Sequence, residues 1–324
     1  MKADPSAPSM PQFDITIAGE LNLDLILYGL PAELPTEREL LAERMTLTLG
    51  ASSAIVAHNL ASLGSRVGFQ SLIGNDQLGQ IALERLAQSG VDTSLVRRST
   101  ASVSTGLTVI LQRESGRHIL TYSGTIAGLT LHDLDLAYLS DSRHFHLSSY
   151  YLQAGLRPHV RELFRLLKQA SGLTISLDTN DDPDDRWDGA LREVLPLVNV
   201  FLPNRREACK IACTDDPELA LSRLAELVPL VVVKMGRQGA IARHGSERTE
   251  SAAHHVDVVD PVGAGDSFDA GFLHEYLQGN NLTNCLAAGN LAGALSTTRA
   301  GGTEAFRDRE HREKFLREHA AKPR

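Results

Sequence analysis

Hydrophobic runs of strand length alternate with helical segments through the second half of the chain. The runs at 144–149, 173–180 and 198–203 are short and rich in apolar residues. Segments with apolar residues at helical spacing, 156–170 and 188–195, lie between them. This alternation is typical of a parallel sheet whose strands are joined by helices packed on both faces. We therefore predict an α/β fold with a mostly parallel central sheet.

Two strand-rich blocks in the first half fall outside this alternation. After a first strand expected at 13–18, residues 31–49 contain a loop and then an alternating apolar run. Residues 105–122 have many β-branched residues on either side of a glycine-containing turn, which predicts a hairpin. We expect these blocks, at about 31–49 and 101–122, to form strands outside the central sheet.

One stretch near the C-terminus, 256–279, combines several local signals. Its first apolar residues, 256–259, predict a strand that Pro261 ends. Gly263 and Gly265 follow, and apolar residues then recur at helical spacing to the end of the stretch. A strand, a glycine turn and a helix start bring unpaired backbone N–H groups together at the positive end of the helix dipole. Such a place binds anions, phosphate above all.

Asp266 lies at the mouth of this anion site. Its carboxylate can simply cap the helix, or it can act as a base beside a bound phosphate, as phosphoryl transfer to a hydroxyl requires. Two commoner phosphate motifs are excluded. The chain has no GxxxxGK[ST] sequence, and the glycines at 263 and 265 lack the third glycine of a dinucleotide-binding fingerprint.

Composition narrows the class of protein. The 324 residues are 42% hydrophobic and 22% charged, which is typical of a globular protein with one large α/β domain and a small appendage, or with two ordinary domains. A net charge of −8 argues against a nucleic-acid-binding surface. No apolar run approaches the roughly 20 residues that span a bilayer. Residues 1–11 lack a signal-peptide core, so we expect a flexible tail there and a cytoplasmic protein that binds no membrane.

Two pairs of residues have the spacing of metal ligands. Cys209 and Cys213 are four apart, as on one helix face, and His144 and His146 lie on one face of a strand. Neither pair has further ligands in reach along the sequence, so we expect buried thiols and packed histidines. With Cys285 the chain has three cysteines, which cannot form a disulfide framework for a chain of this length.

The stretch around Asp266 resembles the D-x-x-G-A-G-D signature of the ribokinase-like (PfkB) carbohydrate kinases. The residues at its fixed positions are Asp260, Gly263, Ala264, Gly265 and Asp266. The resemblance implies a three-layer α/β/α domain over residues 12–324 with a small β-sheet lid above a sugar site. It also implies that Asp266 is the general base and that the backbone amides of 263–265 form an anion hole.

The sugar-site candidates begin with Asn22 and Asp24. They lie two apart in an extended segment, so they point the same way and can bind polyol hydroxyls or cap a turn. The pattern G-x-x-N-x-D is similar to the family's first strand, whose aspartate holds sugar hydroxyls. Asn180 follows a strand at the edge where open α/β sheets bind ligands. The alternative is that the polar residues there cap a helix at 181–187.

Gly50 and Ala51 open a helix of small residues that resembles the family's sugar-contacting helix. Two positions depart from the family pattern: Ala51 replaces the second glycine and Ile55 replaces the sugar-contacting asparagine. The loss of that amide changes the expected specificity, because a site built for hydroxyls discriminates through its paired polar groups. Three polar residues of the helix are alternatives for the lost contact: Ser52, Ser53 and His58.

The nucleotide-site candidates lie farther along the chain. Asn204 and Glu207 form an N-x-x-E pattern, which on its own is a helix capping box. In the family that glutamate and asparagine organise Mg²⁺-bound water and the nucleotide phosphates, and one glutamate is enough because Mg²⁺ keeps several waters. The resemblance also places the turn after Lys234, with Gly236 and Gly239, along the nucleotide. By the same resemblance Asn290 falls beside the adenine.

Further elements are implied by the resemblance alone. Backbone carbonyls at Asp260, Val262, Ser296 and Gly301 fall where many relatives bind a K⁺-like ion. The exposed edge of the lid would offer an interface for a homodimer.

The function expected from the sequence is ATP- and Mg²⁺-dependent phosphorylation of a hydroxyl group on a small sugar. Within the kinases, a nucleoside kinase is the alternative, although an aromatic content of 5% supplies few residues for stacking on a base. Outside the enzymes, the alternative is a sugar- or nucleotide-binding sensor without catalysis. Its support comes from Ala51 and Ile55, and the intact Asp266 weighs against it.

Overall fold

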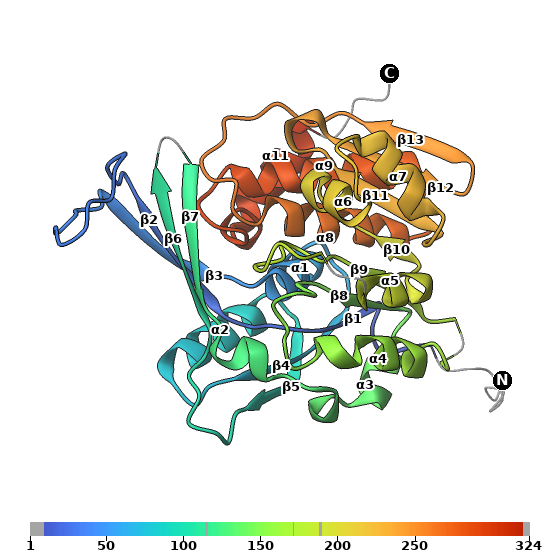
Figure 1. Ribbon diagram of the computed structural model, residues 1–324, viewed down its shortest axis with the longest axis horizontal. Coiled ribbons are helices and arrows are strands. Elements are labelled where there is room, and N and C mark those ends of the chain that lie inside the picture. The colour runs from blue at the N-terminus through green and yellow to red at the C-terminus, as the bar shows by residue number, and fades with distance from the viewer. Residues whose placement is uncertain (1–9, 114–115, 171, 188–189, 320–324) are drawn as a thin grey trace.

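A large sheet forms the centre of the molecule (Figure 1). The computed structural model describes residues 10–113, 116–170, 172–187 and 190–319. Within these residues nine strands form one sheet in the order β13-β12-β11-β10-β9-β8-β1-β4-β5. The strands are β1 (Ile15–Ala18), β4 (Val67–Ile73), β5 (Asp92–Arg98), β8 (His144–Leu147), β9 (Thr174–Leu177), β10 (Val200–Phe201), β11 (Leu230–Lys234), β12 (Ala240–His244) and β13 (Glu247–Ser251). The pairs β11–β12 and β12–β13 are antiparallel and the other neighbours are parallel, which confirms the predicted sheet.

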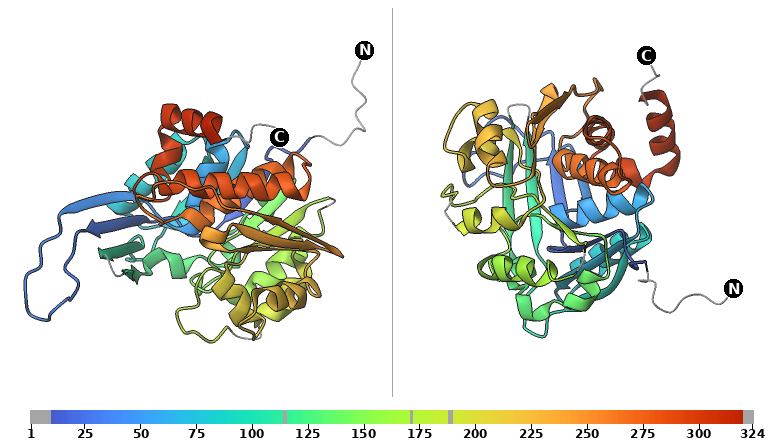
Figure 2. Two further views of the ribbon diagram at one scale, coloured as in Figure 1. Left: turned by 90° about the horizontal axis from the view of Figure 1, so that it is seen from above. Right: turned by 90° about the vertical axis from the view of Figure 1, so that its right-hand side faces the viewer.

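Helices cover both faces of this sheet (Figure 2). On one face pack α1 (Ser52–Ser62), α2 (Gln77–Gln88), α8 (Ala264–Leu277) and α9 (Leu282–Thr297). On the other face pack α3 (Leu136–Ser140), α4 (Val160–Leu167), α5 (Ala190–Val194), α6 (Arg205–Ile211) and α7 (Pro217–Ala225). Two further helices, α10 (Glu304–Arg307) and α11 (Arg309–His319), follow α9. Short 3₁₀ turns lie at Gly124–Gly128, Leu131–Asp133, Arg157–His159, Leu195–Leu197 and Gly236–Gln238.

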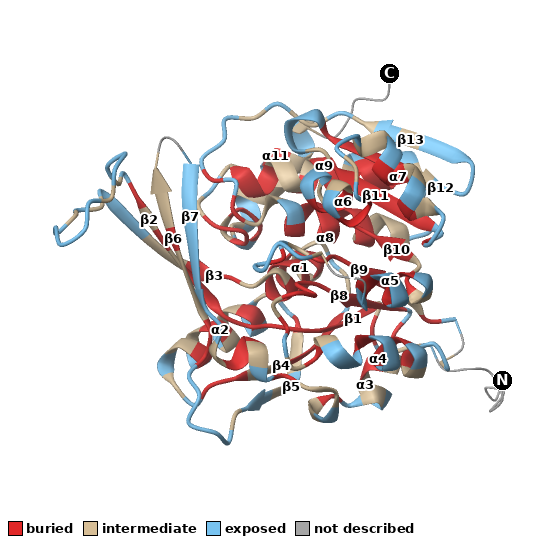
Figure 3. Cartoon of the chain, viewed as in Figure 1, coloured by how far each residue is buried: buried red, intermediate tan, exposed pale blue. Residues whose placement is uncertain are grey.

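Strand β11 shows why the sheet has two cores. Val231 and Val233 pack with one helical layer, while Leu230 and Val232 pack with the other. Successive side chains of a strand point to opposite faces, so a continuous apolar run belongs to a strand that is buried on both sides. Figure 3 shows the buried residues concentrated along the central strands and the inner sides of the helices.

A second, smaller sheet stands apart from the central one (Figure 1). Within the described residues it has four strands in the order β3-β2-β6-β7. They are β2 (Leu23–Tyr28), β3 (Arg44–Leu49), β6 (Leu107–Arg113) and β7 (Gly116–Tyr122). Three of them lie within the blocks expected from the sequence. The fourth, β2, was missed, because it begins five residues after β1 ends and pairs with residues far away in sequence.

Some local expectations were wrong. Residues 256–259 do not form a strand: the chain between β13 and α8 is irregular, with Val258 and Val259 about half exposed at 49% and 50%. The backbone N–H of Val259 donates to the carbonyl of Thr297, at the end of α9, at 2.8 Å and is therefore not part of a β-ladder. The helix considered at 181–187 is also not formed. The expected tail falls largely on residues 1–9 and the centre of the 105–122 turn on residues 114–115, both outside the described residues.

The histidine expectation is confirmed. His144 and His146 are fully buried and form a hydrogen-bonded row with hydroxyl groups. Ser176 Oγ lies 2.7 Å from His144 Nε2 and 2.7 Å from His146 Nδ1. Burial lowers the pKa of His144 to about 3 and that of His146 to about 4, so both rings are neutral and packed.

Candidate active site

The carboxyl ends of the parallel strands bring polar residues to one edge of the central sheet. Glu20 follows β1, Ser149 follows β8, and Asp178 directly follows β9. Asn204 follows β10, and Lys234 is the last residue of β11. Open α/β sheets bind ligands at this edge. The N-terminus of α8 reaches the same place, because Asp266 interacts electrostatically with Asp178, Lys234 and Glu20.

The turn into α8 depends on glycine. Gly263 is the residue before the helix and has φ 73°, in the left-handed region. A Cβ at this position would lie 2.4 Å from the Cα of Gly302, so the neighbouring loop leaves no room for a side chain. At Gly265 the nearest atom to such a Cβ is Lys234 Nζ at 3.6 Å, which is ordinary contact. The backbone at the start of α8 therefore lies close to the lysine ammonium group.

Asp266 is a buried carboxyl, 9% exposed, in the first turn of α8. Burial raises its pKa to about 6, the negative charge of Asp178 adds to the rise, and Lys234 opposes it. A hydrogen bond from the Ser52 side chain also favours the ionised form. Ser52 Oγ in turn accepts from Asn180 Nδ2 at 2.5 Å. Asn180 therefore positions Ser52, and Ser52 contacts the carboxyl group.

Asp24 is the second carboxyl of the site. A Cβ at residue 50 would lie 2.1 Å from Asp24 Oδ1, so glycine is required at Gly50 for the aspartate to sit there. Burial raises the pKa of Asp24 to about 7, and the charge of Asp266 adds to this rise. The two carboxyls therefore share one buried region. Asn22 is buried beside Asp24, and its side-chain amide donates to the carbonyl of Leu23 at 3.1 Å.

The residue after Gly50 has an unusual backbone. Ala51 has φ 64°, a conformation that side chains other than glycine adopt rarely. This geometry explains why a glycine would be the ordinary residue here. Ile55, one turn later, is 2% exposed. It packs against Gly302 and Gly263: a Cβ added at these glycines would lie 2.7 Å and 3.3 Å from its Cδ1.

The three alternatives for the lost asparagine contact separate clearly. Ser52 lies beside Asp266, as described above. Ser53 Oγ donates to Glu20 Oε2 at 2.8 Å, and Ser149 Oγ donates to Glu20 Oε1 at 2.6 Å, so Ser53 belongs to the support of the helix start. His58 is two turns away and lines a different cavity. Glu20 and Ser149 were not predicted from the sequence, because a buried carboxylate with hydroxyl partners leaves no pattern in one sequence.

Lys234 forms a buried ionic cluster at the same edge. Its Nζ lies 2.8 Å from Asp178 Oδ2 and 3.0 Å from Asp269 Oδ2. Burial opposes the charge on the lysine, but the two aspartates outweigh it and raise its pKa. Burial alone would raise the pKa of Asp178, yet the lysine holds it below its ordinary value, while that of Asp269 is raised well above it. Lys234 and Asp178 are therefore a charged pair. Asp269, on α8, was not predicted from the sequence.

A cavity of 290 Å³ opens between the end of β11 with the turn that follows it, the segment 253–261, and the two helices α8 and α9. Its lining includes six residues that were proposed from the sequence for the nucleotide or the anion hole: Lys234, Gly236, Gly239, Ala264, Gly265 and Asn290. The side-chain amide of Asn290 donates to the carbonyl of Ser251 at 2.9 Å and so ties α9 to the end of β13. Gly239 has φ 92°, and a Cβ there would meet the carbonyl oxygen of Ser251 at 2.0 Å.

Asn204 and Glu207 form a complete capping box. Asn204 Oδ1 accepts from the N–H of Glu207 at 3.0 Å, and Glu207 Oε2 accepts from the N–H of Asn204 at 2.8 Å. Glu207 is 4% exposed; burial raises its pKa to about 8, and the charge of Asp178 adds to this. Neither residue lines the 290 Å³ cavity. No cluster of three or more His, Cys, Asp or Glu residues that could hold a metal ion occurs in the described part of the chain.

The loops around Asp260 are held by its carboxylate. This group accepts hydrogen bonds from Tyr28 Oη at 2.7 Å, from the N–H of Val262 at 3.0 Å and from the N–H of Gly301 at 3.0 Å. Within residues 10–319 as described, the carbonyls of Asp260, Val262 and Gly301 accept no hydrogen bond. The buried hydroxyl of Ser296 also has no partner there. The carbonyl of Ser296, the fourth one expected to bind a monovalent cation, instead accepts from the N–H of Arg299 at 3.4 Å, so it differs from the other three.

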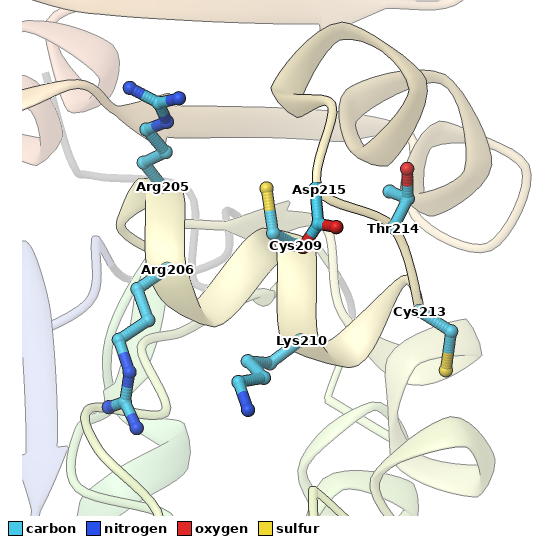
Figure 4. A pocket seen from close by; sticks show the side chains of 7 residues that line it. All are labelled: Arg205, Arg206, Cys209, Lys210, Cys213, Thr214 and Asp215. Carbon is cyan, nitrogen blue, oxygen red and sulfur yellow. The ribbon is translucent and has the colours of Figure 1, made fainter.

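The cysteine expectation was wrong in part. Cys285 is buried, but Cys209 is partly exposed and Cys213 is exposed. Cys213 lies beyond the end of α6, where φ is 52°, so the two residues do not share a helix face. Figure 4 shows the two sulfur atoms pointing in different directions from the pocket that they help to line.

Known proteins resemble this chain over most of its length. The family model for pfkB family carbohydrate kinases matches residues 12–309. The 2-dehydro-3-deoxygluconokinase of Bacillus subtilis (strain 168) is 31% identical over 280 residues, which are 83% of this chain and 86% of that protein. A candidate ribokinase II from E. coli in its apo form matches with a TM-score of 0.80 at 27% identity, over 95% of this chain and 100% of that one. A structure of a candidate E. coli ribokinase II with ATP and Mg²⁺ has a TM-score of 0.78 at the same identity and coverage.

The fold and these neighbours define the class: this is a ribokinase-type α/β/α protein with a mostly parallel central sheet and a small separate sheet. The match over residues 12–309 defines the family as well. The chain belongs to the pfkB family of carbohydrate kinases, and it is a sugar kinase, a phosphotransferase with an alcohol group as acceptor. Among the helices described here, none has the length and apolar character needed to cross a bilayer.

Proposed function

We propose that this kinase transfers the γ-phosphoryl group of ATP to a hydroxyl of a small sugar, with Asp266 as the general base. The observation that carries the proposal is the position of Asp266. It lies in the first turn of α8, directly after Ala264 and Gly265, which line the 290 Å³ cavity, and its charge acts on Asp24. Its pKa is about 6. A base with a pKa near the working pH is ionised often enough to take a proton and basic enough to hold it.

In this proposal a carboxylate, a set of backbone amides and a lysine each have a separate role in the reaction. The carboxylate of Asp266 takes the proton of the sugar hydroxyl as its oxygen attacks phosphorus. The backbone amides of residues 263–265 would stabilise the negative charge on the phosphoryl oxygens, because they lie at the positive end of the helix dipole. The N–H of Ala264 donates to the carbonyl of Pro261 at 3.3 Å and would exchange this hydrogen bond for one to a phosphoryl oxygen. The charge of Lys234, close to Gly265, supports the same function.

The sugar would occupy the region around Asp24. Asp24 would hold sugar hydroxyls, and Gly50 and Ala51 would let the backbone approach the ring. Asn180 would contribute directly or through Ser52, whose hydroxyl it positions. Asn22 would support the loop, because its amide already bonds to the backbone.

The nucleotide would occupy the 290 Å³ cavity. Gly236 and Gly239 would lie along it, and Asn290 would be near the base. The E. coli structure with ATP and Mg²⁺ supports both ligands for this class of fold. Asn204 and Glu207 would hold Mg²⁺ through its water molecules: a single buried carboxylate fits an ion that retains most of its waters. When bound, Mg²⁺ neutralises charge on the phosphate groups.

Two further features belong to the proposal. The backbone carbonyls of Asp260, Val262, Ser296 and Gly301 would be uncharged oxygen ligands for K⁺, although that of Ser296 already accepts from the N–H of Arg299. The smaller sheet would act as a lid and as a homodimer interface. Its strands β3 and β7 carry four exposed apolar side chains, which a partner copy would cover: Met45, Ile119, Leu120 and Tyr122.

The test is a substrate panel with ATP and Mg²⁺, in which ADP release is measured for free sugars, sugar acids and nucleosides. Turnover of a sugar or sugar acid that falls in Asp266→Asn supports the proposal. Preferential turnover of a nucleoside would make the protein a nucleoside kinase. Ligand-induced thermal stabilisation without turnover of any compound would identify a binding protein that has lost catalysis.

A further inference from the structure

A second cavity, of 500 Å³, lies at the far end of α1 from the active site. Ser52, at the start of α1, contacts Asp266, whereas Ser62, at its end, lines this cavity. Ten residues of α-helix separate them by about 15 Å. The other walls come from the last turns of α2 and from α10 and α11. The cavity is therefore distinct from the sites described above.

Arginine dominates the lining of this cavity. Four of its ten described lining residues are arginines, Arg85, Arg307, Arg309 and Arg312, and none of the ten is acidic. The whole chain carries a net charge of −8, so a cavity lined by four arginines and no acidic residue is much more positive than the average surface of this protein. A neighbouring cavity of 640 Å³ shares Arg85 and Arg307 as a common wall.

Two of these arginines have no carboxylate partner within the described residues. Arg85 Nη1 donates to the carbonyl of Leu47 at 2.7 Å, and Arg312 donates to the carbonyl of Phe306. Arg307 and Arg309, in contrast, pair with Glu304 at 3.3 Å and Glu313 at 2.6 Å. Burial lowers the pKa of Arg312; the charge of Glu313 opposes this effect, and the charge of Arg309 adds to it. An anion between these guanidinium groups would remove that repulsion.

The geometry points to a binding site for a phosphate group, either free phosphate or the phosphate of a small ester. Guanidinium groups present planar, two-pronged donors that match phosphate oxygens, and several of them around one cavity favour a multiply charged anion over a chloride ion. The volume leaves room for the rest of an ester. His58 also lines this cavity and is 3% exposed. Its ring is neutral, since burial lowers its pKa to about 4. This inference does not depend on the proposed function.

The test is calorimetric titration of the full chain with inorganic phosphate and, separately, with glycerol 3-phosphate. A non-hydrolysable ATP analogue with Mg²⁺ is kept in excess to occupy the active site. Three variants are compared with the wild type. Arg312→Gln removes an unpaired charge, and Ser62→Glu places a carboxylate in the cavity without removing any arginine. Arg161→Gln, which alters an exposed arginine of α4 paired with Glu193 at 3.4 Å, is the matched control.

We expect both cavity variants to weaken phosphate binding about tenfold or more, because a hydrogen-bonded charge contact contributes that much, and the control to leave it unchanged. Binding of glycerol 3-phosphate but not of free phosphate would identify an ester as the ligand. Absence of binding to the wild type at millimolar phosphate and ester, or equal affinity in wild type and Ser62→Glu, would overturn the inference. Should Arg312→Gln fail to fold, Ser62→Glu alone decides the matter, since Ser62 is partly exposed at the end of α1.

Discussion

Replacing Asp266 with asparagine should separate activity from stability. The two side chains have nearly the same shape, so the first turn of α8 and the contact with Ser52 are preserved. The variant loses the base, and we expect kcat to fall by a factor of about 10² to 10⁴. That corresponds to a rise of about 3 to 5 kcal/mol in the activation barrier.

Stability should change in the opposite direction. The folded-state pKa of Asp266 is about 6, above the ordinary value of 3.8, because ionisation in a buried site is unfavourable. Above about pH 6 the wild type therefore carries a destabilising charge that is absent near pH 4 and below. The pKa difference corresponds to about 3 kcal/mol of unfolding free energy, to order of magnitude. Asp266→Asn should be more stable than the wild type at pH 8 by up to that amount, and equally stable at pH 4.

The assay is ADP release between about pH 5 and pH 9, combined with unfolding in denaturant at pH 4 and pH 8. Wild-type kcat/KM should rise about tenfold for each pH unit below about pH 6 and then level off, whereas the residual activity of the variant should not follow this curve. The matched control is Asp24→Asn, which should raise the KM for the sugar more than it lowers kcat. A variant that keeps wild-type turnover, or a wild-type profile that is flat from pH 5 to pH 7, would refute the role of Asp266.

Three further predictions concern the neighbouring residues. Gly50→Ala should raise the KM for the sugar by about tenfold or more in steady-state kinetics, because the added Cβ would lie 2.1 Å from Asp24 and displace it. Gly128→Ala, whose added Cβ would be in ordinary contact with Leu72 at 3.4 Å, is the control, and an equal KM in the two variants would contradict the geometry. Lys234→Met should lower the unfolding free energy by about 3 to 5 kcal/mol, because Asp178 loses its buried counterion. Asp269→Asn should lower the unfolding free energy far less, and equal effects of the two variants in denaturant titration would show that the cluster is not ionic. The apparent Mg²⁺ affinity in the kinase assay should rise with pH up to about 8, since the raised pKa of Glu207 keeps this group protonated below that pH. Glu207→Gln should remove this pH dependence, and a wild-type affinity independent of pH would exclude Glu207 from Mg²⁺ binding.

Much of the fold followed from local patterns in the sequence. The apolar runs from residue 144 onward form the parallel strands, and the glycine turn before Asp266 is required by the close approach of Gly302. The pattern of each feature is local in the sequence, although the contact that makes glycine necessary at residue 263 comes from the distant Gly302. Strand β2 was missed because its hydrogen-bonding partners, β3 and β6, lie far from it in sequence.

The candidate site could be predicted less completely, for a similar reason. Asp266, Asp24 and Lys234 belong to recognisable motifs. Asp269 became a candidate only through its contact with Lys234, which comes from a distant element. Ser52 was one of three alternatives in its helix, and only its contact with Asp266 distinguished it from the other two. Val258 and Val259 gave a false strand, because an apolar run that borders a cavity has the same pattern as one in a sheet.

The four residues that join β1 to β2, Gly19 to Asn22, are all buried. A linker of this kind cannot swing freely, because Glu20 is anchored to Ser53 and Ser149 while Asn22 is bonded to the start of β2. Of the connections between the two sheets, this one is therefore a stiff segment that leads directly into Asp24. In the proposed kinase, a tilt of the smaller sheet would move Asp24 with it, so covering the sugar and binding its hydroxyls would be coupled motions.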